Sequence, residues 1–457
     1  MSRSEAGPKA RSYGSGARIL SIGIASTGLL TFAYFSIASH VLGEHAAKRI
    51  DLLWSVMFVI ISVIYRPIEQ LLSRTIAERR AHGHEQHALR VPMLIQAGFA
   101  LLFLALALAL KGELIDHVFE HTTALYDVLV VGTLAYGASY FARGWLAGHQ
   151  RFGLFGGLVL MESTSRICFA LAVAVGVASG ETAVALGIAA APLVSLVVVP
   201  LAFAREGGRG TPRELAGDAP ITVDEADAAL AGPATEAVQE AAAHSELSLR
   251  RGGGFAVWVS GIMLSEQTLL NAAVLTVDAT SSNGRLAGIV FNVLLIARAP
   301  LQLFQAIQTS LLPHLTGLEA TEGHEAFARA IRLTVLAIAA FAGAVTVGLL
   351  IIGPFALRHV FFGQHFTYKG TGLALIGIGM GLHLISGALN QAALARDRAR
   401  AAAACWGVAA AVFLGWMLAP AISDQLLRAE IGYAGATALL ALLLAGLYRR
   451  STVPPRT

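Results

Sequence analysis

Apolar runs of about twenty residues recur along the whole of this chain. A helix needs ~20 mostly apolar residues to cross the ~30 Å hydrocarbon core of a bilayer. Only 14% of the 457 residues are charged, against about 25% in a soluble domain, so the chain is predicted to be an all-α integral membrane protein. About twelve transmembrane helices are expected, six on each side of a polar segment. The predicted spans are Ile19–Leu42, Leu52–Ile76, Val91–Leu110, Tyr126–Ala147, Phe152–Val177, Thr182–Ala204, Phe255–Val277, Leu286–Leu312, Ala330–Ile352, Thr371–Ala393, Ala401–Ala419 and Glu430–Leu447.

Basic residues favour one orientation of these spans. With the N-terminus inside, 23 of the 33 lysines and arginines are assigned to the cytoplasmic side, including those at the inner ends of spans, and 7 to the outside; the other 3, Arg66, Arg166 and Arg298, lie deep in the membrane. Cytoplasmic loops of membrane proteins carry an excess of Lys and Arg. A multi-pass protein of the plasma (cytoplasmic) membrane with both termini in the cytoplasm is therefore predicted. The preference for arginine over lysine indicates a GC-rich bacterial genome.

An acidic segment separates the two halves. Residues 206–253 are rich in Asp and Glu with scattered Pro and Gly, which predicts a mostly disordered cytoplasmic linker. Both halves begin inside and have an even number of spans, so they are expected to share orientation, as parallel repeats about an axis along the membrane normal. The predicted domains are a tail at 1–18, a six-helix bundle at 19–205, the linker at 206–253, a second bundle at 254–448 and a tail at 449–457.

An arginine lies inside the apolar run Leu286–Leu312. A charge near the bilayer centre costs at least ~2.5–3.5 kcal/mol and normally faces a polar cavity or a partner. Arg298 is followed at helical spacing by Gln302, and Pro300 lies between them. This pattern predicts a broken helix with one polar stripe.

The first half repeats this arrangement with Arg66, Pro67, Glu69 and Gln70. Aligning the two arginines also aligns the two glutamines, and the prolines fall one position apart. Two broken helices, one in each half, are what a transporter uses to build a polar site at the membrane midplane. The alternative is a chance Arg-Pro pair with a structural salt bridge.

The fourth and tenth spans end in similar tight, basic turns. The first of these follows Arg143-Gly144 and ends at Arg151, whereas the second has Asn390-Gln391 in place of the Arg-Gly pair. The similarity supports a repeat, and the substitution argues against a symmetric role for the two turns.

Three charged residues lie inside the fifth and seventh spans. Glu162 and Arg166 are four residues apart, a spacing that allows a pair on one helix face. Such a pair either helps the helix insert or lines a polar cavity, and both interpretations stay open. Glu266 has no basic residue near it on its own helix. Burial disfavours a charged carboxylate, so Glu266 is predicted to couple transport to protons or sodium; the alternative is a neutral, hydrogen-bonded carboxyl.

Together these residues predict a polar central region of balanced to mildly cationic character. Arginine binds phosphate through a bidentate fork, which favours an anionic, phosphate-bearing substrate. The sequence has no P-loop motif and no His/Cys/carboxylate cluster with metal-ligand spacing, so no enzyme activity, cofactor or metal is predicted. The predicted substrate-binding residues are Arg66, Glu69, Gln70, Arg143, Glu162, Arg166, Arg298 and Gln302.

With these features the chain resembles the polysaccharide transporter branch of the multidrug/oligosaccharidyl-lipid/polysaccharide exporter superfamily. The resemblance covers the twelve spans but not the linker. It rests on the six-plus-six layout, the helices of Arg66 and Arg298, and the turn from Arg143-Gly144 to Arg151. It implies a V-shaped fold of two bundles around a central cationic cavity. It also implies a flippase that moves a polyprenyl-diphosphate-linked oligosaccharide, a precursor of cell-surface polysaccharide or lipopolysaccharide, from the inner to the outer leaflet by alternating access.

The resemblance also assigns roles and partners. Arg66, Arg166 and Arg298 would hold the diphosphate or acidic sugars, while Arg143, placed near the cytoplasmic surface, would guide the substrate inward. The implied partners are the lipid-linked oligosaccharide, membrane lipids, and a glycan polymerase or glycosyltransferases, without nucleic acid.

Two other transport functions compete with this one. A cation-coupled multidrug antiporter of the same superfamily would use a membrane carboxylate such as Glu266, but the number of arginines speaks against it. A flippase for the peptidoglycan lipid intermediate would usually bring extra C-terminal spans, and the last predicted span here ends at Leu447. A membrane scaffold for glycan assembly would leave the buried charges unexplained.

Overall fold

The computed structural model describes residues 23, 26–31, 33–81, 89–197, 200, 248–280, 304, 310–356, 369–419 and 422–450. The regular structure in these ranges is helical, as predicted. Residues 26–31, 33–41 and 310–321 are also helical. The labelled helices are α2 (Glu44–Ile64), α3 (Arg66–Ala81), α4 (Arg90–Ala109), α5 (Lys111–Glu113), the π-helix η1 (Leu114–Val118), α6 (Thr123–Gly148), α7 (Phe152–Ala174), α8 (Gly180–Ser195), α12 (Leu249–Thr280), α14 (Gly323–Ile351), α15 (Gly353–Ala356), α16 (Gly370–Ala395), α17 (Ala399–Leu418) and α18 (Gln425–Arg450).

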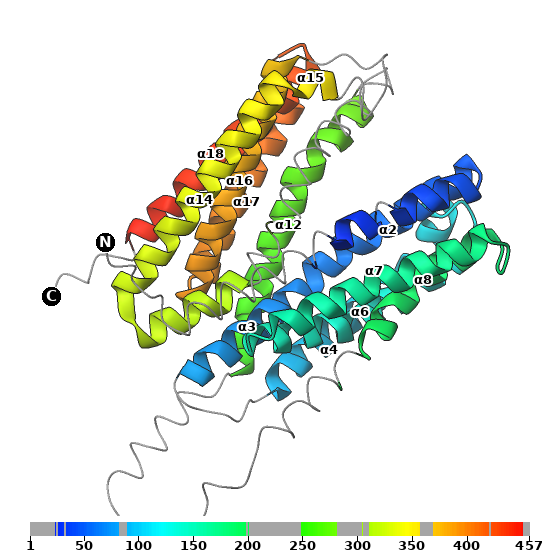
Figure 1. The fold of residues 1–457 in the computed structure, drawn as a ribbon, viewed down its shortest axis with the longest axis horizontal. Helices are drawn as coiled ribbons and strands as arrows, with labels where there is room; N and C mark the ends of the chain where they lie inside the picture. Colours follow the sequence, from blue (N-terminus) through cyan, green and yellow to red (C-terminus); the bar gives the residue numbers. More distant parts are fainter. Residues whose placement is uncertain are drawn as a thin grey trace, which may run out of the picture.

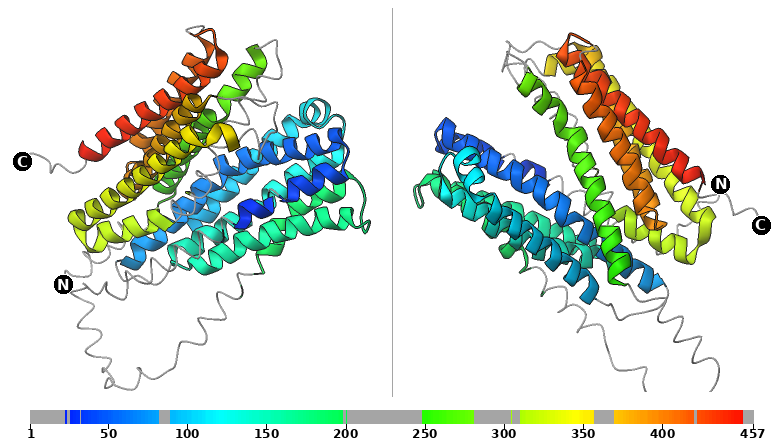
Figure 2. Two further views of the ribbon diagram at one scale, coloured as in Figure 1. Left: turned by 45° about the horizontal axis from the view of Figure 1, so that its top comes forward. Right: turned by 180° about the vertical axis from the view of Figure 1, so that it is seen from behind.

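The helices form two bundles that meet near one end and diverge toward the other (Figure 1). The first bundle contains α2, α3, α4, α6, α7 and α8, and the second contains α12, α14, α16, α17 and α18; α12 packs against both (Figure 2). The end at which α12 begins is called the linker end below, because the predicted linker precedes it, and the opposite end is called the far end. This arrangement agrees with the predicted V shape.

Each bundle has its own apolar core, and the two cores meet through α3 and α4. The core of the second bundle includes Ile68 and Leu71 of α3 and Ile95 of α4, all of them buried. Lipid tails are as apolar as these side chains, so close packing, rather than the removal of apolar surface from water, holds such an interface together. The described parts of the bundles are therefore in van der Waals contact across the molecule.

Seven of the described helices are long and apolar enough to cross a membrane: α4, α6, α7, α14, α16, α17 and α18. Each coincides with a predicted span. α8 is apolar but shorter, and α12 begins at Leu249, so residues 249–253 of the predicted linker are helical. Most of the predicted eighth span and nearly all of the remaining linker lie outside the described residues.

The predicted second span needs correction, because the structure places two consecutive helices there. α2 ends at Ile64, Tyr65 forms a turn, and α3 begins at Arg66. Pro67 has no N–H to give to the preceding turn and its ring clashes with the carbonyl four residues back. The predicted break next to Arg66 is confirmed, and the two helices together are longer than the predicted Leu52–Ile76.

α6 and α16 are the most enclosed of the candidate spans. In the most apolar 18-residue stretch of each helix, 56% of the residues of α6 and 72% of those of α16 are buried inside the protein, compared with 11–39% in the other five helices. Glycine lets α3 approach α6 closely, since a Cβ at Gly144 would lie 2.9 Å from the carbonyl oxygen of Glu69. A Cβ at Gly148 would lie 2.7 Å from Cβ of Ile76. The small residues of the predicted Arg-Gly segment thus fix the distance between these two helices.

The turns that follow α6 and α16 have the same backbone geometry. Gln150 and Asp397 have positive φ angles of 57° and 59°, the left-handed conformation that commonly ends a helix. The next residue in each turn, Arg151 or Arg398, donates its N–H to the carbonyl five residues before it, over 2.8 and 2.9 Å. This shared turn agrees with the predicted parallel relation of the two halves.

Candidate functional site

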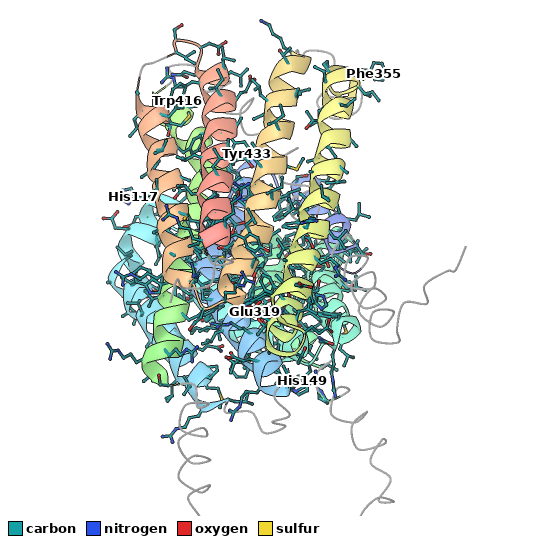
Figure 3. The ribbon with its side chains drawn as sticks, turned by 90° about the vertical axis from the view of Figure 1, so that its left-hand side faces the viewer. His117, His149, Glu319, Phe355, Trp416 and Tyr433 are labelled. Atoms are coloured by element: carbon teal, nitrogen blue, oxygen red, sulfur yellow. The ribbon has the colours of Figure 1, made fainter. Side chains whose placement is uncertain are left out.

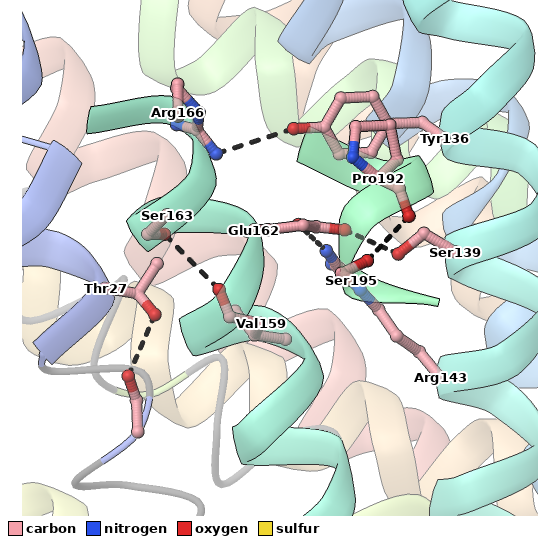
Figure 4. Close-up of polar contacts among 11 residues, drawn as sticks. Thr27, Tyr136, Ser139, Arg143, Val159, Glu162, Ser163, Arg166, Pro192 and Ser195 are labelled. Atoms are coloured by element: carbon pink, nitrogen blue, oxygen red, sulfur yellow. Dashed lines mark hydrogen bonds and ion pairs between the residues drawn. The ribbon is translucent and has the colours of Figure 1, made fainter. Parts of the chain in front are cut away.

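A buried ion pair joins α6 to α7 in the first bundle. Arg143 Nη2 contacts Glu162 Oε2, and Ser139 Oγ donates a 2.5 Å hydrogen bond to Glu162 Oε1 (Figure 4). The side chain of Glu162 is 3% exposed and that of Arg143 is 11% exposed. The Arg143 guanidinium also lies 4.5 Å from the centre of the Tyr140 ring. Arg143 is thus buried in a charge pair near the end of α6, and its role in guiding the substrate inward stays a prediction.

Arg166 does not pair with Glu162, so the predicted couple within one helix is wrong. Glu162 contacts Ser139 and Arg143 of α6, and Arg166 Nη2 donates over 3.4 Å to Tyr136 Oη, at a different level of the same helix (Figure 4). The Arg166 guanidinium lies 4.1 Å from the centre of the Trp54 ring of α2, a cation–π arrangement. Its Nε and Nη1 atoms have no hydrogen-bond partner among the described residues, although the residue is only 3% exposed.

The start of α3 brings more charges to the same region. Glu69 is 7% exposed and interacts electrostatically with Arg143 and Glu162. Arg66 interacts with Glu69 of the first bundle and also with Glu266 of the second. Gln70 is buried beside them, and its Oε1 has no hydrogen-bond partner in the described part of the chain. The break in the helix at Tyr65 therefore places Arg66 between the polar groups of the two bundles.

Glu266 of α12 was expected to lack a partner, but α16 supplies one. His383 Nε2 lies 3.7 Å from Glu266 Oε1, which is within the range of an ion pair and beyond that of a hydrogen bond. The other ring nitrogen, Nδ1, lies 3.3 Å from Tyr433 Oη of α18. Tyr433 lies between Phe355 and Trp416 of the far end and Glu319 of the linker end (Figure 3). Sequence reasoning did not select His383, because only the fold brings this residue near Glu266.

The second bundle carries a neutral pair where the first carries Arg143 and Glu162. Asn390 lies seven residues before the left-handed residue of its turn, as Arg143 does in the first half. Trp406 Nε1 donates to Asn390 Oδ1 over 3.1 Å, joining α17 to α16. Among the described residues, the first bundle therefore joins α6 to α7 by a buried charged pair, whereas the second joins α16 to α17 by a neutral hydrogen bond.

The structure brings together six of the predicted site residues and Glu266. The three described arginines are matched by three carboxylates, so the mildly cationic character that was predicted depends on Arg298. Arg298 and Gln302 lie outside the described residues. The described members are Arg66, Glu69, Gln70, Arg143, Glu162, Arg166 and Glu266, and they form a polar path from Arg166 in the first bundle to His383 in the second.

A second group of charges ties the bundles together at the linker end. Arg74 of α3 donates from Nη1 to Asp397 Oδ1 over 2.8 Å, and Arg251 of α12 donates from Nη2 to Asp397 Oδ2 over 2.8 Å. Burial alone would raise the pKa of the Asp397 carboxyl, but the two guanidinium groups lower it below its ordinary value of 3.8. The contacts of Asp397 with Arg74 and Arg251 are called the linker-end latch below. Arg74 and Asp397 belong to different bundles, so the latch holds the bundles together. The sequence placed Arg74 at the inner end of the second predicted span, Arg251 in the linker and Asp397 in a turn, and this contact was not predicted.

No group of three or more His, Cys, Asp or Glu side chains that could hold a metal ion occurs among the described residues. The polar path consists of arginines, carboxylates, hydroxyls and one histidine. Such a set can bind an anionic ligand through its arginines and can carry protons through Glu266 and His383.

Known proteins resemble this chain in structure but not in sequence. No known protein family and no curated protein matches the sequence. The MATE transporter ClbM in complex with Rb+ has a TM-score of 0.73 at 12% identity and covers 97% of this chain and 96% of that one. A MOP superfamily transporter from Pyrococcus furiosus, described by a reverse polarity of its binding pocket, has a TM-score of 0.72 at 14% identity over 96% of both chains. An outward-facing multidrug resistance transporter of the MATE family has a TM-score of 0.68 at 13% identity, over 98% of this chain and 97% of that one.

Proposed function

We propose that this chain, which has the all-helical fold of MATE transporters of the MOP superfamily, is a flippase for a polyprenyl-diphosphate-linked oligosaccharide. It moves this lipid from the inner to the outer leaflet by alternating access of its two bundles. The fold belongs to transporters, in agreement with the prediction that the chain is not an enzyme, but the fold alone does not determine the substrate. The Pyrococcus furiosus transporter is described by a reversed polarity of its binding pocket, so pocket charge can differ between proteins of this fold. The substrate is therefore inferred from the polar residues of this chain.

Arg166 is the observation on which this proposal rests. A guanidinium inside a membrane is expensive to bury, and unmade hydrogen bonds to a charged group add to that cost. Arg166 keeps two nitrogens without an acceptor among the described residues, and aromatic groups of Trp54 and Tyr136 hold its position. A diphosphate would supply the acceptors, because arginine pairs with phosphate oxygens through two parallel hydrogen bonds.

The orientation and the domain boundaries predicted from the sequence belong to this proposal. The linker end faces the cytoplasm, and both termini lie on that side of the plasma membrane. The bundles meet near this end and diverge toward the far end (Figure 1). The state described here would therefore be open to the outside and closed to the cytoplasm.

The ion pair of Glu266 with His383 favours a second candidate, a cation-coupled multidrug antiporter of the same superfamily. Ionisable residues inside a membrane mark ion and proton pathways, and they are often paired with one another. Coupling to protons is also compatible with a flippase, so the substrate and the coupling ion need separate tests.

Replacing Arg166 by Gln is expected to reduce lipid transport about tenfold to a hundredfold. Hydrogen bonds to a charged group contribute about 1.5–3 kcal/mol, and each 1.4 kcal/mol is a factor of ten. The measurement is the transbilayer movement of a fluorescent polyprenyl-diphosphate oligosaccharide by purified protein in proteoliposomes. Arg329→Gln, which neutralises an exposed arginine of α14, is the control and is expected to transport like the wild type.

Efflux of a lipophilic cationic dye is measured from the same vesicles. Lipid movement that needs Arg166, without dye efflux, supports the flippase. Dye efflux without lipid movement would reject it and favour the antiporter. Lipid movement that Arg166→Gln leaves unchanged would remove Arg166 from the substrate site.

The pH dependence of transport is expected to disappear in both Glu266→Gln and His383→Gln. Each substitution keeps a polar side chain of similar size and removes one of the two ionisable partners of this contact. Transport is measured between about pH 5 and pH 8, the range in which histidine changes its charge. A pH profile that both variants share with the wild type would exclude this pair as the coupling site, whereas loss in only one variant would identify that residue as the proton carrier.

A further inference from the structure

A basic pocket at the linker end lies outside the polar path described above. It has a volume of about 380 Å³ and is formed by the beginnings of α12 and α17. The charged side chains that line it are Arg250, Arg251, Arg400 and Asp397. The linker-end latch occupies Asp397 and Arg251, but neither Arg250 nor Arg400 forms an ion pair within the described chain. The pocket therefore offers two exposed guanidinium groups that pair with no carboxylate among the described residues.

The start of α17 adds positive potential to this pocket. Ala399 is the first residue of the helix and lines the pocket. No side-chain cap of this helix end occurs among the described residues, and the positive end of the helix dipole favours an anion beside it. Glu78 of α3 is the other carboxylate whose charge reaches Arg251, and the arginines still outnumber the two carboxylates.

The same pocket continues into an apolar, exposed surface. Trp258 lines it and is 41% exposed, and Val257 beside it is 57% exposed. The Arg400 guanidinium lies 5.7 Å from the centre of the Trp258 ring. Tryptophan is enriched where a membrane protein crosses the water interface, and basic pockets between transmembrane helices bind anionic lipid headgroups. A phosphate with acyl chains fits both parts of this surface.

We propose that the pocket between the starts of α12 and α17 binds the headgroup of an anionic phospholipid from the leaflet at the linker end. The phosphate pairs with Arg250 and Arg400 beside the first turn of α17, and an acyl chain lies along Trp258 and Val257. Asp397 connects this site to Arg74 of the first bundle. A bound headgroup therefore sits next to the contact that holds the bundles together. The site is independent of the substrate assigned above.

Glycines of α12 allow a steric test without any change of charge. Gly254 lines the pocket, and a Cβ at Gly253 or Gly254 would meet no heavy atom within 4 Å. Gly254→Leu is expected to fill the pocket, whereas Gly253→Leu, a neighbour outside the lining, is the matched control. Binding of phosphatidylglycerol and phosphatidylcholine to the full chain is measured by native mass spectrometry. Gly254→Leu should bind phosphatidylglycerol at least tenfold more weakly, and Gly253→Leu should bind it like the wild type.

A second pair of variants tests the charges. Neutralising Arg250 and Arg400 together to Gln is expected to weaken phosphatidylglycerol binding about tenfold to thirtyfold, since each basic residue near the surface contributes to anionic-lipid attraction. Neutralising Arg329 and Arg450, which are exposed elsewhere, is the matched control and should have little effect. Monodisperse elution from a sizing column shows that each variant is folded.

Several outcomes would overturn the proposal. If the charge variants and their controls lose phosphatidylglycerol binding equally, the lipid is attracted by the net charge of the protein and not by this pocket. If Gly254→Leu binds phosphatidylglycerol like the wild type, the pocket is not the site. Displacement of phosphatidylglycerol by millimolar inorganic phosphate, with equal binding of phosphate in its absence, would assign the pocket to soluble anions. If phosphatidylglycerol binds only after Glu236, Glu240 and Glu246 of the linker are changed to Gln, the acidic linker and not a lipid is the occupant of the pocket.

Discussion

In a double-mutant cycle, Arg143→Met is expected to destabilise the protein by about 3–5 kcal/mol, and the combined Arg143→Met/Glu162→Gln variant by much less than the two single variants together. Removing one member of a buried ion pair leaves an uncompensated charge, while replacing both is often close to neutral. Both side chains are largely buried. Met can still pack on the Tyr140 ring, and Gln keeps an acceptor for Ser139.

The measurement is the free energy of unfolding in mixed micelles for the wild type, both single variants and the double variant. Arg329→Met, at an exposed position of α14, is the control and is expected to stay within ~0.5 kcal/mol of the wild type. Additive effects of the two substitutions would show that the residues do not depend on each other, contrary to the structure.

The same cycle separates structure from function. If the double variant is stable and still transports lipid, Arg143 and Glu162 only join α6 to α7. If it is stable and does not transport, the pair takes part in substrate binding, as the sequence predicted. Because the double variant restores stability, an inactive result cannot be attributed to misfolding.

The sequence predicted the helices better than it predicted their partners. Apolar runs show which segments can cross a membrane because the thickness of the bilayer fixes their length, and a proline beside Arg66 shows where a helix breaks. Spacing along one helix shows which residues share a face, but it does not show which neighbouring helix that face meets. Glu162 was therefore assigned to Arg166 on its own helix, whereas the fold gives it Arg143 of α6.

Contacts between helices far apart in the sequence were the least predictable part of the site. His383 was a single histidine in an apolar helix, a pattern typical of a packing residue, and only the fold places it beside Glu266. Asp397 lay in a predicted cytoplasmic turn among basic residues. A carboxylate at the left-handed position of a tight turn, surrounded by arginines, is a signal that sequence reasoning could have used.

Replacing Asp397 by Asn is expected to shift the protein toward conformations in which the bundles separate at the linker end. The substitution removes the charge that holds Arg74 and Arg251. Asn also adopts positive φ angles readily, so the turn is kept. Asp397 is 43% exposed at its side chain, and solvent weakens such pairs, so the expected change is about 1–2 kcal/mol, which is roughly a 5- to 30-fold change in population.

The separation is measured by electron paramagnetic resonance between spin labels at Arg80 and Glu325, both exposed, with Cys168 and Cys405 changed to Ala. Asp397→Asn and Arg74→Gln should each increase the population with a long distance. The double variant should add little to either, because both substitutions break one contact. Arg49→Gln, which breaks ion pairs at the far end of the first bundle, should leave the distance unchanged.

The latch also has a defined pH dependence. The pKa of Asp397 is lowered in the latched state, so the contact stabilises that state fully above the ordinary pKa and is lost only as the pH falls through the lowered value. The distance between the labels should thus stay constant from about pH 8 to pH 5. A latch that opened in this range would have to be driven by another group, such as His383 beside Glu266. Opening that Glu266→Gln abolishes and Asp397→Asn leaves intact would show that the pair of Glu266 and His383, rather than the linker-end latch, controls the movement of the bundles.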